Sequence, residues 1–269
     1  MIQLQSQQYP QFAKQFWKEE NRWEMTDCCF DNPLAQGSFW VDRLEQPQQA
    51  AVLLGDFLFL QGRADCTFLR QAVVQNGLLL MGKQDWLNCA KKSFVQTKEY
   101  LRYRFDGSNL LKNREKLRAW RDCLPKGMKL QKIDEEWFAR CRQEEWMRDF
   151  VSQYRSFEEY RHTAGGWLLL AGERPVSGAS CYLSSRKGFA IQVQTDEQHQ
   201  GHGYAKIVSA ALILEGLRLG LYPDWDADNP ASAALAQSLG YRLQQSYPTV
   251  MVEDNALRPL FGVKMQGNS

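Results

Sequence analysis

Apolar and polar residues alternate along the chain in runs that predict short strands separated by helices. "AAVLLGDFLFLQG" (residues 50–62) has the composition of two strands, and its central Gly55-Asp56 is typical of a hairpin turn. "LRYRF" (residues 101–105) alternates between apolar and basic side chains, which favours a strand with one buried face. "FLRQAVVQNG" (residues 68–77) favours a short helix that stops at its glycine. Residues 1–125 therefore predict an N-terminal α/β domain.

The second half of the chain gives a clearer order of elements. "CLPKGMK" (residues 123–129) contains Pro125 and Gly127 and marks the expected boundary, so that residues 126–269 form the second domain. "FAIQVQ" (residues 189–194) alternates strictly and predicts a strand. Around it the pattern predicts a hairpin over residues 166–183, a helix over 204–219, a strand over 221–227, a helix over 229–240 and a last strand or hairpin over 241–252.

Charge and composition exclude several classes of protein. The 33 basic and 31 acidic residues are dispersed, and the net charge of +2 provides no electrostatic footprint for nucleic acid or an anionic membrane. The hydrophobic share of 44% is that of a protein with a core. The first residues lack the pattern of a signal peptide, and no apolar run approaches the ~18–20 residues that span a bilayer. We expect a cytoplasmic protein.

The cysteines carry no recognisable motif. Seven of them are scattered along the chain, no CxxC pair occurs, and the sequence has three histidines. These features argue against a disulfide framework and against a zinc site. The prediction is a set of reduced, mostly buried thiols and no bound metal.

One stretch, "QTDEQHQGHGYAK" (residues 194–206), places two glycines where a predicted strand meets a predicted helix. Glycines let a ligand approach the backbone, and N–H groups at a helix N-terminus favour a phosphate. The N–H groups of residues 200–205 are the expected donors. A turn without a ligand is one alternative. A dinucleotide-binding loop is another, but Lys206 occupies the place of its third glycine and a six-residue polar bend replaces its tight turn.

A third interpretation uses more of the chain. "QHQGHG" (residues 198–203) fits the Q/R-x-x-G-x-G/A loop, and the helix that begins at Asn229 ends in Gly240-Tyr241. Together with the order of strands and helices over residues 128–252, these motifs resemble the GNAT superfamily of acyl-CoA-dependent N-acyltransferases. The combination is most similar to the subgroup of zwittermicin-A-resistance-type acetyltransferases. The resemblance implies an α+β fold with a mixed, mostly antiparallel sheet flanked by helices in the C-terminal half.

The resemblance also implies roles for particular positions. The backbone of residues 193–195 would hold the pantetheine arm of acetyl-CoA in the manner of an added strand. The loop N–H groups would bind the pyrophosphate, and Asn229 would hydrogen-bond the pantetheine or place the thioester. The cofactor would enter where the strands 189–195 and 222–227 splay apart. The residues implied in cofactor binding are Val193, Gln194, Thr195, Gln200, Gly201, His202, Gly203, Tyr204, Ala205 and Asn229.

The catalytic residues depart from the family pattern. Many members have a tyrosine that protonates the leaving thiolate, and Ala236 stands at its position. Ser232, one turn earlier, is a substitute acid, or else a residue that bonds the start of the helix. The strand before the loop contains no Asp or Glu, so Asp226 is the nearest acid that could serve as a base. Trp225 is expected to pack and shape the pocket.

The sequence thus predicts an acetyl-CoA-dependent N-acetyltransferase that acts on a primary amine of a small molecule by direct attack, without a covalent enzyme intermediate. The alternative is a non-catalytic CoA-binding or regulatory module that kept the loop and lost the chemistry. Residues 1–125 would be a degenerate second copy of the fold or a substrate-gating domain. The acceptor and the oligomeric state are not determined by the sequence.

Overall fold

The computed structural model describes residues 1–18, 24–31 and 36–258. The chain forms two compact units, and both are assembled from separate stretches of sequence. The first contains residues 1–18, 38–100 and 248–269, and the second contains residues 19–37 and 101–247. The predicted boundary after residue 125 falls inside the second unit, where the helix before it packs against a helix of the C-terminal half.

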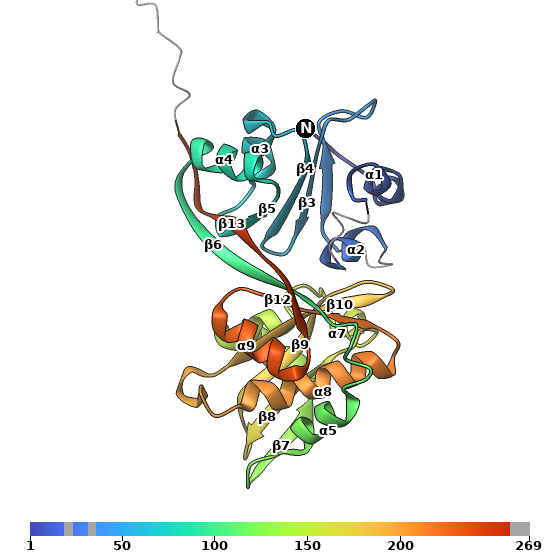
Figure 1. Cartoon of the computed structure of the whole chain (residues 1–269), viewed down its shortest axis with the longest axis vertical. Coiled ribbons are helices and arrows are strands. Elements are labelled where there is room, and N and C mark those ends of the chain that lie inside the picture. The colour runs from blue at the N-terminus through green and yellow to red at the C-terminus, as the bar shows by residue number, and fades with distance from the viewer. Residues whose placement is uncertain (19–23, 32–35, 259–269) are drawn as a thin grey trace, which may run out of the picture. The chain divides into compact units, whose positions relative to one another are not determined.

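The first unit is built on a mixed sheet in which β1 to β5 and then β13 are neighbours (Figure 1). The predicted hairpin about Gly55-Asp56 is present, since β3 and β4 pair antiparallel. Helix α3 then crosses over to β5, which lies parallel to β4. The bounds are β1 Ile2–Gln3, α1 Tyr9–Phe16, β2 Ser38–Val41, β3 Gln49–Leu54, β4 Phe57–Gly62, α3 Cys66–Ala72, β5 Leu78–Met81 and α4 Gln84–Ser93.

A disulfide in the first unit corrects the expectation that all thiols are reduced. Cys66 on α3 and Cys89 on α4 are bonded to each other, with their Cα atoms 5.2 Å apart. Their residue spacing gave no hint of this, because the pairing depends on how the two helices pack. The remaining thiols agree better with the prediction: Cys28, Cys29, Cys141 and Cys181 are buried, whereas Cys123 is exposed.

The second unit contains a five-stranded sheet in the order β11-β10-β9-β8-β7. Its pairs are antiparallel except for β10 and β11, which are parallel and joined through α8. A β-bulge interrupts the pairing of β10 with β9 between Ala190 and Ile191. The strands are β7 Met128–Lys132, β8 Gly166–Ala171, β9 Arg174–Ser184, β10 Gly188–Thr195 and β11 Tyr222–Asp224. The predicted mixed, mostly antiparallel sheet is therefore confirmed.

Helices cover this sheet. Helix α8 packs across β8, β9 and β10, with α5 beside it (Figure 1), and α2 and η3 contact β9 and β10. Burial of Phe150, Phe189 and Val208 among apolar neighbours forms the core of this unit. The helical bounds are α2 Glu24–Phe30, α5 Arg114–Asp122, α6 Glu135–Gln143, η3 Glu145–Phe150, α7 Phe157–Tyr160, η4 Glu197–His199, α8 Tyr204–Arg218 and α9 Pro230–Leu239.

Two long strands are divided between the units. β6 (Phe94–Asp106) and β13 (Arg242–Leu257) each begin in one unit and end in the other. Within the second unit, β6 pairs antiparallel with the two-residue strand β12 (Asp226–Ala227). The predicted strand over residues 221–227 is thus split, with its first half in one sheet and its second half in another.

None of the helices described is long and apolar enough to cross a membrane. Over residues 1–18, 24–31 and 36–258, no three histidine, cysteine or acidic side chains gather where they could hold a metal ion.

Candidate active site

A wedge opens between β10 and β11. The two strands are paired over three positions, from Gly188 opposite Tyr222 to Ala190 opposite Asp224. Beyond that pair, β10 continues to Thr195 alongside β9, whereas the chain after β11 turns to pair with β6. Among the residues that the structure describes, no strand pairs with this edge of β10 beyond Ala190. The predicted splay between these strands is therefore present, and its closed end lies at Ala190 and Asp224.

The glycine loop lies at the open end of the wedge. Gly201 and Gly203 have φ angles of +80° and +79°, a conformation that favours glycine, and a Cβ added to either would meet no atom within 4 Å. Of the predicted donors, the N–H of Gln200 is already bonded to the Glu197 oxygen at 3.4 Å, whereas within the part of the chain that the structure describes those of residues 201–205 have no hydrogen-bond acceptor. Since α8 begins at Tyr204, these donors lie at its positive end. The loop can therefore receive an anion.

The start of the loop is fixed by ionic contacts. The Asp196 carboxylate accepts a hydrogen bond from the N–H of Gln198 and is 2.8 Å from a guanidinium nitrogen of Arg174 on β9. The same carboxylate is 3.2 Å from Nδ1 of His199. Hydrogen bonds from the Gln198 N–H, His199 and Arg174 hold the pKa of Asp196 below its usual value despite its partial burial. Asp196 thus stays ionised and ties the loop to the sheet.

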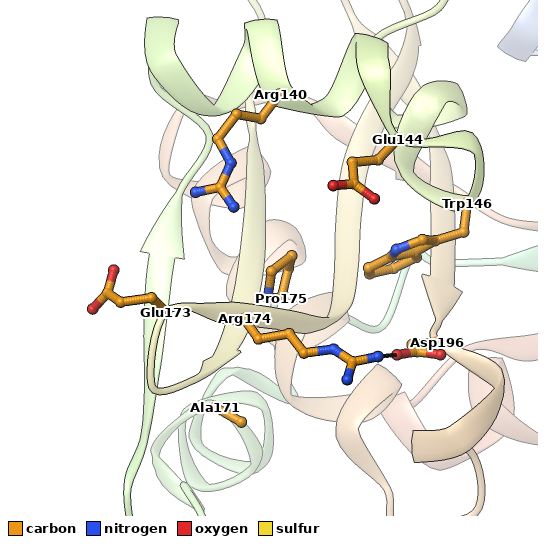
Figure 2. Close-up of a pocket in the computed structure, with 8 residues that line it drawn as sticks. All are labelled: Arg140, Glu144, Trp146, Ala171, Glu173, Arg174, Pro175 and Asp196. Atoms are coloured by element: carbon orange, nitrogen blue, oxygen red, sulfur yellow. Dashed lines mark hydrogen bonds and ion pairs between the residues drawn. The ribbon is translucent and has the colours of Figure 1, made fainter.

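Figure 2 shows this ion pair at the edge of a cavity of about 640 Å³ beside the β8–β9 hairpin. Arg140 and Glu144 reach into the hollow from α6 and the residue after it, and Trp146 comes from η3 (Figure 2). The Arg140 guanidinium lies 3.9 Å from the centre of the Trp137 ring. Charges of both signs line this cavity, which shares Asp196 with the start of the glycine loop.

A second cavity, of about 510 Å³, contains the predicted cofactor residues. Its walls are the last residues of β10, the glycine loop, the first turn of α8 and the start of α9. His202 is the predicted residue that does not line it, because its ring stacks on Tyr204 instead, with centroids 5.3 Å apart. Lys206 also lines the cavity, and its ammonium lies 4.0 Å from the centre of the Trp120 ring. The residues implied by the resemblance are thus brought together, apart from His202.

Asn229 lines the cavity and also caps helix α9. It is the N-cap of α9: its side-chain oxygen accepts the N–H of Ser232 at 2.9 Å, and its amide donates to Asp228 at 2.8 Å. The Ser232 hydroxyl lines the cavity and accepts a hydrogen bond from the indole N–H of Trp225 at 3.2 Å. Because the indole supplies the donor, the hydroxyl hydrogen remains available to another acceptor.

Trp225 itself is 3% exposed and packs within an apolar cluster, with its ring centre 5.5 Å from that of Tyr241. The prediction that it packs and shapes the site agrees with this placement. Ala236, at the position where many family members have a tyrosine, is fully buried in the same cluster. No hydroxyl reaches the cavity from that position.

Asp226 lies in a buried ion pair. Its carboxylate is 2.7 Å from Nε of Arg102, it accepts the hydroxyl of Tyr247, and its backbone oxygen accepts a second guanidinium N–H at 3.2 Å. Burial raises the pKa of Asp226, while Arg102 and Tyr247 act in the opposite direction. In the sequence, Arg102 lies 124 residues from Asp226 and Tyr247 lies 21 residues from it. The local sequence pattern therefore gave no sign of this network.

Asp224 is a buried acid that the sequence did not assign to the acetyl-transfer site. It ends β11 at the closed end of the wedge and is 6% exposed. Burial is the largest cause that raises the pKa of Asp224 from 3.8 to about 8, and the negative charges of Asp226 and Glu24 add to it. In the sequence it is one of three aspartates in "DWDAD", and local pattern does not distinguish which of them is desolvated.

Known proteins similar to this chain agree with the geometry. The model of the GNAT acetyltransferase family matches residues 14–250, well beyond the 128–252 on which the sequence resemblance rests. The structure of a GCN5-related N-acetyltransferase-like protein from Streptococcus suis 89/1591 is 29% identical in sequence to this chain, with a TM-score of 0.80. The match covers 94% of this chain and 100% of the Streptococcus chain. The structure of a GCN5-related N-acetyltransferase from Sphaerobacter thermophilus shares the fold, with 11% identity and a TM-score of 0.51, and that match covers 94% of this chain and 97% of the Sphaerobacter chain.

No curated protein matches the chain. The dinucleotide-binding alternative is excluded by the fold, because that fold has a mostly parallel sheet, whereas in this sheet β10 and β11 are parallel and the other pairs are antiparallel. The family match spans most of the chain and includes both units. The chain therefore belongs to the GNAT acetyltransferase family and is an acetyltransferase.

Proposed function

We propose that this protein transfers the acetyl group of acetyl-CoA to a primary amine of a small molecule. The observation that carries the proposal is the row of unsatisfied N–H groups at residues 201–205, which faces a cavity at the open end of the β10–β11 wedge. Such a row suits a pyrophosphate, and the free edge of β10 suits an extended pantetheine arm. Members of the family generally use acetyl-CoA.

Residues at different places around the cavity bind different parts of acetyl-CoA. The N–H groups of Gly201 to Ala205 bind the pyrophosphate, and Lys206 adds a positive charge at the wall. The edge of β10 at Val193 to Thr195 pairs with the amide groups of the pantetheine. The second amide hydrogen of Asn229, which Asp228 leaves available, donates to the same arm. Held in this way, the thioester lies toward the closed end of the wedge.

Ser232 is the proposed donor of a proton to the departing thiolate. Ser232 lines the cavity, and its hydroxyl oxygen accepts the indole N–H of Trp225, so the hydroxyl hydrogen is free to be donated to the thiolate. The carboxylate of Asp226, the predicted base, is engaged by Arg102 and Tyr247, and Asp226 is not among the described residues that line the cavity, so we assign it no proton transfer. Positioning of the amine against the thioester contributes to the rate beyond proton transfer.

The acceptor class follows from the subgroup that the sequence most resembles. The combination of glycine loop, "PDWD" strand and Asn helix supports a polar small molecule, including amine-bearing antibiotics. The alternative of a CoA-binding module without turnover is supported by the buried Ala236 in place of a tyrosine. Both proposals require acetyl-CoA to bind, and a screen of primary amines for release of the CoA thiol separates them.

Gly203→Val tests the cofactor site. The substitution strains the left-handed backbone and places a side chain in the open space beside the N–H groups. Acetyl-CoA at a hundredfold excess over its dissociation constant should stabilise the wild type by about 2.7 kcal/mol, and the variant should lose most of that shift in a thermal titration.

The chain offers a matched control. Gly220, just after α8, also has a positive φ angle of +75°, and a Cβ added there would likewise meet no atom within 4 Å. Gly220→Val should introduce similar strain and keep the stabilisation by acetyl-CoA. An equal loss of the shift in both variants, or no shift in the wild type, would contradict the proposed cofactor site.

A further inference from the structure

Asp224 and Asp226 lie two residues apart but have different surroundings. Asp226 has a guanidinium partner and a phenol donor. Asp224, also buried, accepts a hydrogen bond from the backbone N–H of Trp225 but has no side-chain hydrogen bond or ion pair among the described residues. Removing an anion from water without a cationic partner is unfavourable, so such a carboxylate does not add to the stability of the fold. Its presence points to a role in binding or reaction.

Its position is the closed end of the wedge. The last pair between β10 and β11 joins Ala190 to Asp224, and the cavity begins at Val193, three residues and about 10 Å further along β10. A pantetheine arm that runs along this edge from the loop must point its thioester toward that last pair. Asp224 is therefore the acidic side chain at the inner end of the path.

The register also defines the face on which Asp224 lies. Phe189 contacts Gly216 of α8, since a Cβ on that glycine would lie 2.4 Å from the phenyl ring. Neighbouring residues of a strand point to opposite faces, so Ala190 and its partner Asp224 face away from α8. Helix α2 packs on β9 and β10, and Cys28 of α2 is close enough to Asp224 to respond to its charge.

The charges around Asp224 favour a cation. On α2 the acidic groups are Glu24 and Asp27, and on β12 Asp226 adds a further negative charge. Arg104 of β6 is the positive group that acts on Asp224, and the phenols of Tyr222 and Tyr241 are neutral neighbours. An ammonium group placed here would relieve the repulsion between the carboxylates.

We propose that Asp224 binds the protonated primary amine of the acceptor and takes its proton before the amine attacks the thioester. The assignment rests on the proposed acetyl transfer and names its general base. The supporting geometry is the position of the buried Asp224 carboxylate, which lies at the closed end of the wedge on the face of the sheet opposite α8.

The step conserves atoms and charge. The ammonium gives one proton to the Asp224 carboxylate, and the freed nitrogen lone pair forms a bond to the thioester carbonyl carbon. The carbon–sulfur bond breaks and the thiolate leaves with the bonding pair. Ser232 gives its hydroxyl proton to the thiolate and takes up the second proton that the nitrogen loses as the amide forms. Asp224 then releases its proton to water, so the products are the amide, CoA thiol and one proton.

Asp224→Asn tests this assignment in the full-length protein. Acetyl transfer to a panel of aliphatic diamines, polyamines and amino sugars is followed by release of the CoA thiol. The variant should lose about 10²- to 10⁴-fold in kcat/KM, the range expected when a general base is removed. Its thermal shift with acetyl-CoA should be unchanged, and its melting temperature should not fall, because a neutral amide replaces a desolvated carboxylate.

The pH profile separates a catalytic role from a structural one. The wild-type kcat/KM should rise with pH through about 8, the pKa to which burial raises Asp224, and the variant should lack this rise. Asp122→Asn, the same change on an exposed carboxylate of α5 that pairs with Arg121, should keep both the rate and the profile.

Four outcomes are distinguishable. Loss of turnover and of the pH-dependent rise, with acetyl-CoA binding retained, supports the assignment. Turnover within about tenfold of the wild type overturns it. A wild type that binds acetyl-CoA but neither binds nor acetylates any amine of the panel, by calorimetry in the presence of CoA, overturns the amine site and leaves the cofactor site intact. A wild type that acetyl-CoA does not stabilise overturns the proposed function and this assignment with it.

Discussion

The glycine loop and the aspartate strand are built by different means, although we propose that they serve one site. The loop, residues 194–206, presents backbone N–H groups, and its shape comes from two glycines and a helix start that are contiguous in sequence. The aspartate strand, by which we mean residues 222–228 with the short strands β11 and β12, presents carboxyl groups. The pKa of each carboxyl depends on residues that are distant in sequence, among them Arg102, Tyr247 and α2. The loop is a local structure, whereas the state of each aspartate is set by tertiary neighbours.

This difference has a consequence for how each part responds to change. A site made of backbone N–H groups is disturbed mainly by substitutions that the local backbone conformation does not tolerate. Exchanging the surrounding side chains disturbs it less. A buried carboxyl is sensitive to every charge that is buried with it, because screening by water is weak there. Perturbing one part while measuring the other therefore tests whether they are independent.

The largest effect on stability is expected from Arg102→Met. The substitution keeps much of the side-chain length and leaves the Asp226 carboxylate buried without its cation. Breaking a buried pair by removing one partner costs about 3–5 kcal/mol of the free energy of unfolding. Chemical denaturation measures the loss. Acetyl-CoA should still bind the variant, as measured by calorimetry below its melting temperature, because the proposed binding groups are backbone N–H groups of the loop.

Arg118→Met is the control for that variant. Arg118 pairs with Glu115 on α5, but both side chains are more than half exposed, and exposed pairs contribute little. Equal destabilisation by the two substitutions would contradict the view that burial decides the strength of the Arg102–Asp226 pair. Loss of calorimetric binding of acetyl-CoA by Arg102→Met, measured well below its melting temperature, would contradict the independence of loop and strand.

The next effect concerns pH. Because burial raises the pKa of Asp224 from 3.8 to about 8, the folded chain holds a proton over this range that the unfolded chain has released. The contribution of Asp224 to stability is thus complete below about pH 4 and is lost as pH rises through about 8, with a slope of at most about 1.4 kcal/mol per pH unit. Denaturation at several pH values should show a difference in slope between the wild type and Asp224→Asn, and parallel curves would refute the raised pKa.

The smallest effect is expected from Asn229→Ala, which removes the cap of α9. Loss of the hydrogen bond to the Ser232 N–H should lower the free energy of unfolding by about 1 kcal/mol. Asn113 precedes α5 in the same position but makes no side-chain capping bond, so Asn113→Ala serves as the comparison. A smaller loss for Asn229→Ala than for Asn113→Ala in thermal denaturation would argue against the capping role.

The fold of the second unit was largely predictable from the sequence. The alternation of "FAIQVQ", the apolar hairpin before it and the Asn-Pro and Gly signals of α9 each depend on residues close together in the chain, and each is present in the structure. The division into units was not predictable in the same way. β6 and β13 continue from one unit into the other, so no break in local composition marks the point where the chain passes between them.

The sequence by itself determined the glycine loop, because the glycines, the strand before them and the helix after them specify the direction of the N–H groups through local backbone geometry alone. Only the tertiary structure decided which aspartate is paired and which is not. "DWDAD" presents equivalent carboxyls, and they become different when β11 ends its pairing at Asp224 and β12 brings Asp226 to Arg102. The pKa of a carboxyl depends on desolvation and on charges within a few ångströms, and the partners that provide both come from parts of the chain that meet only on folding.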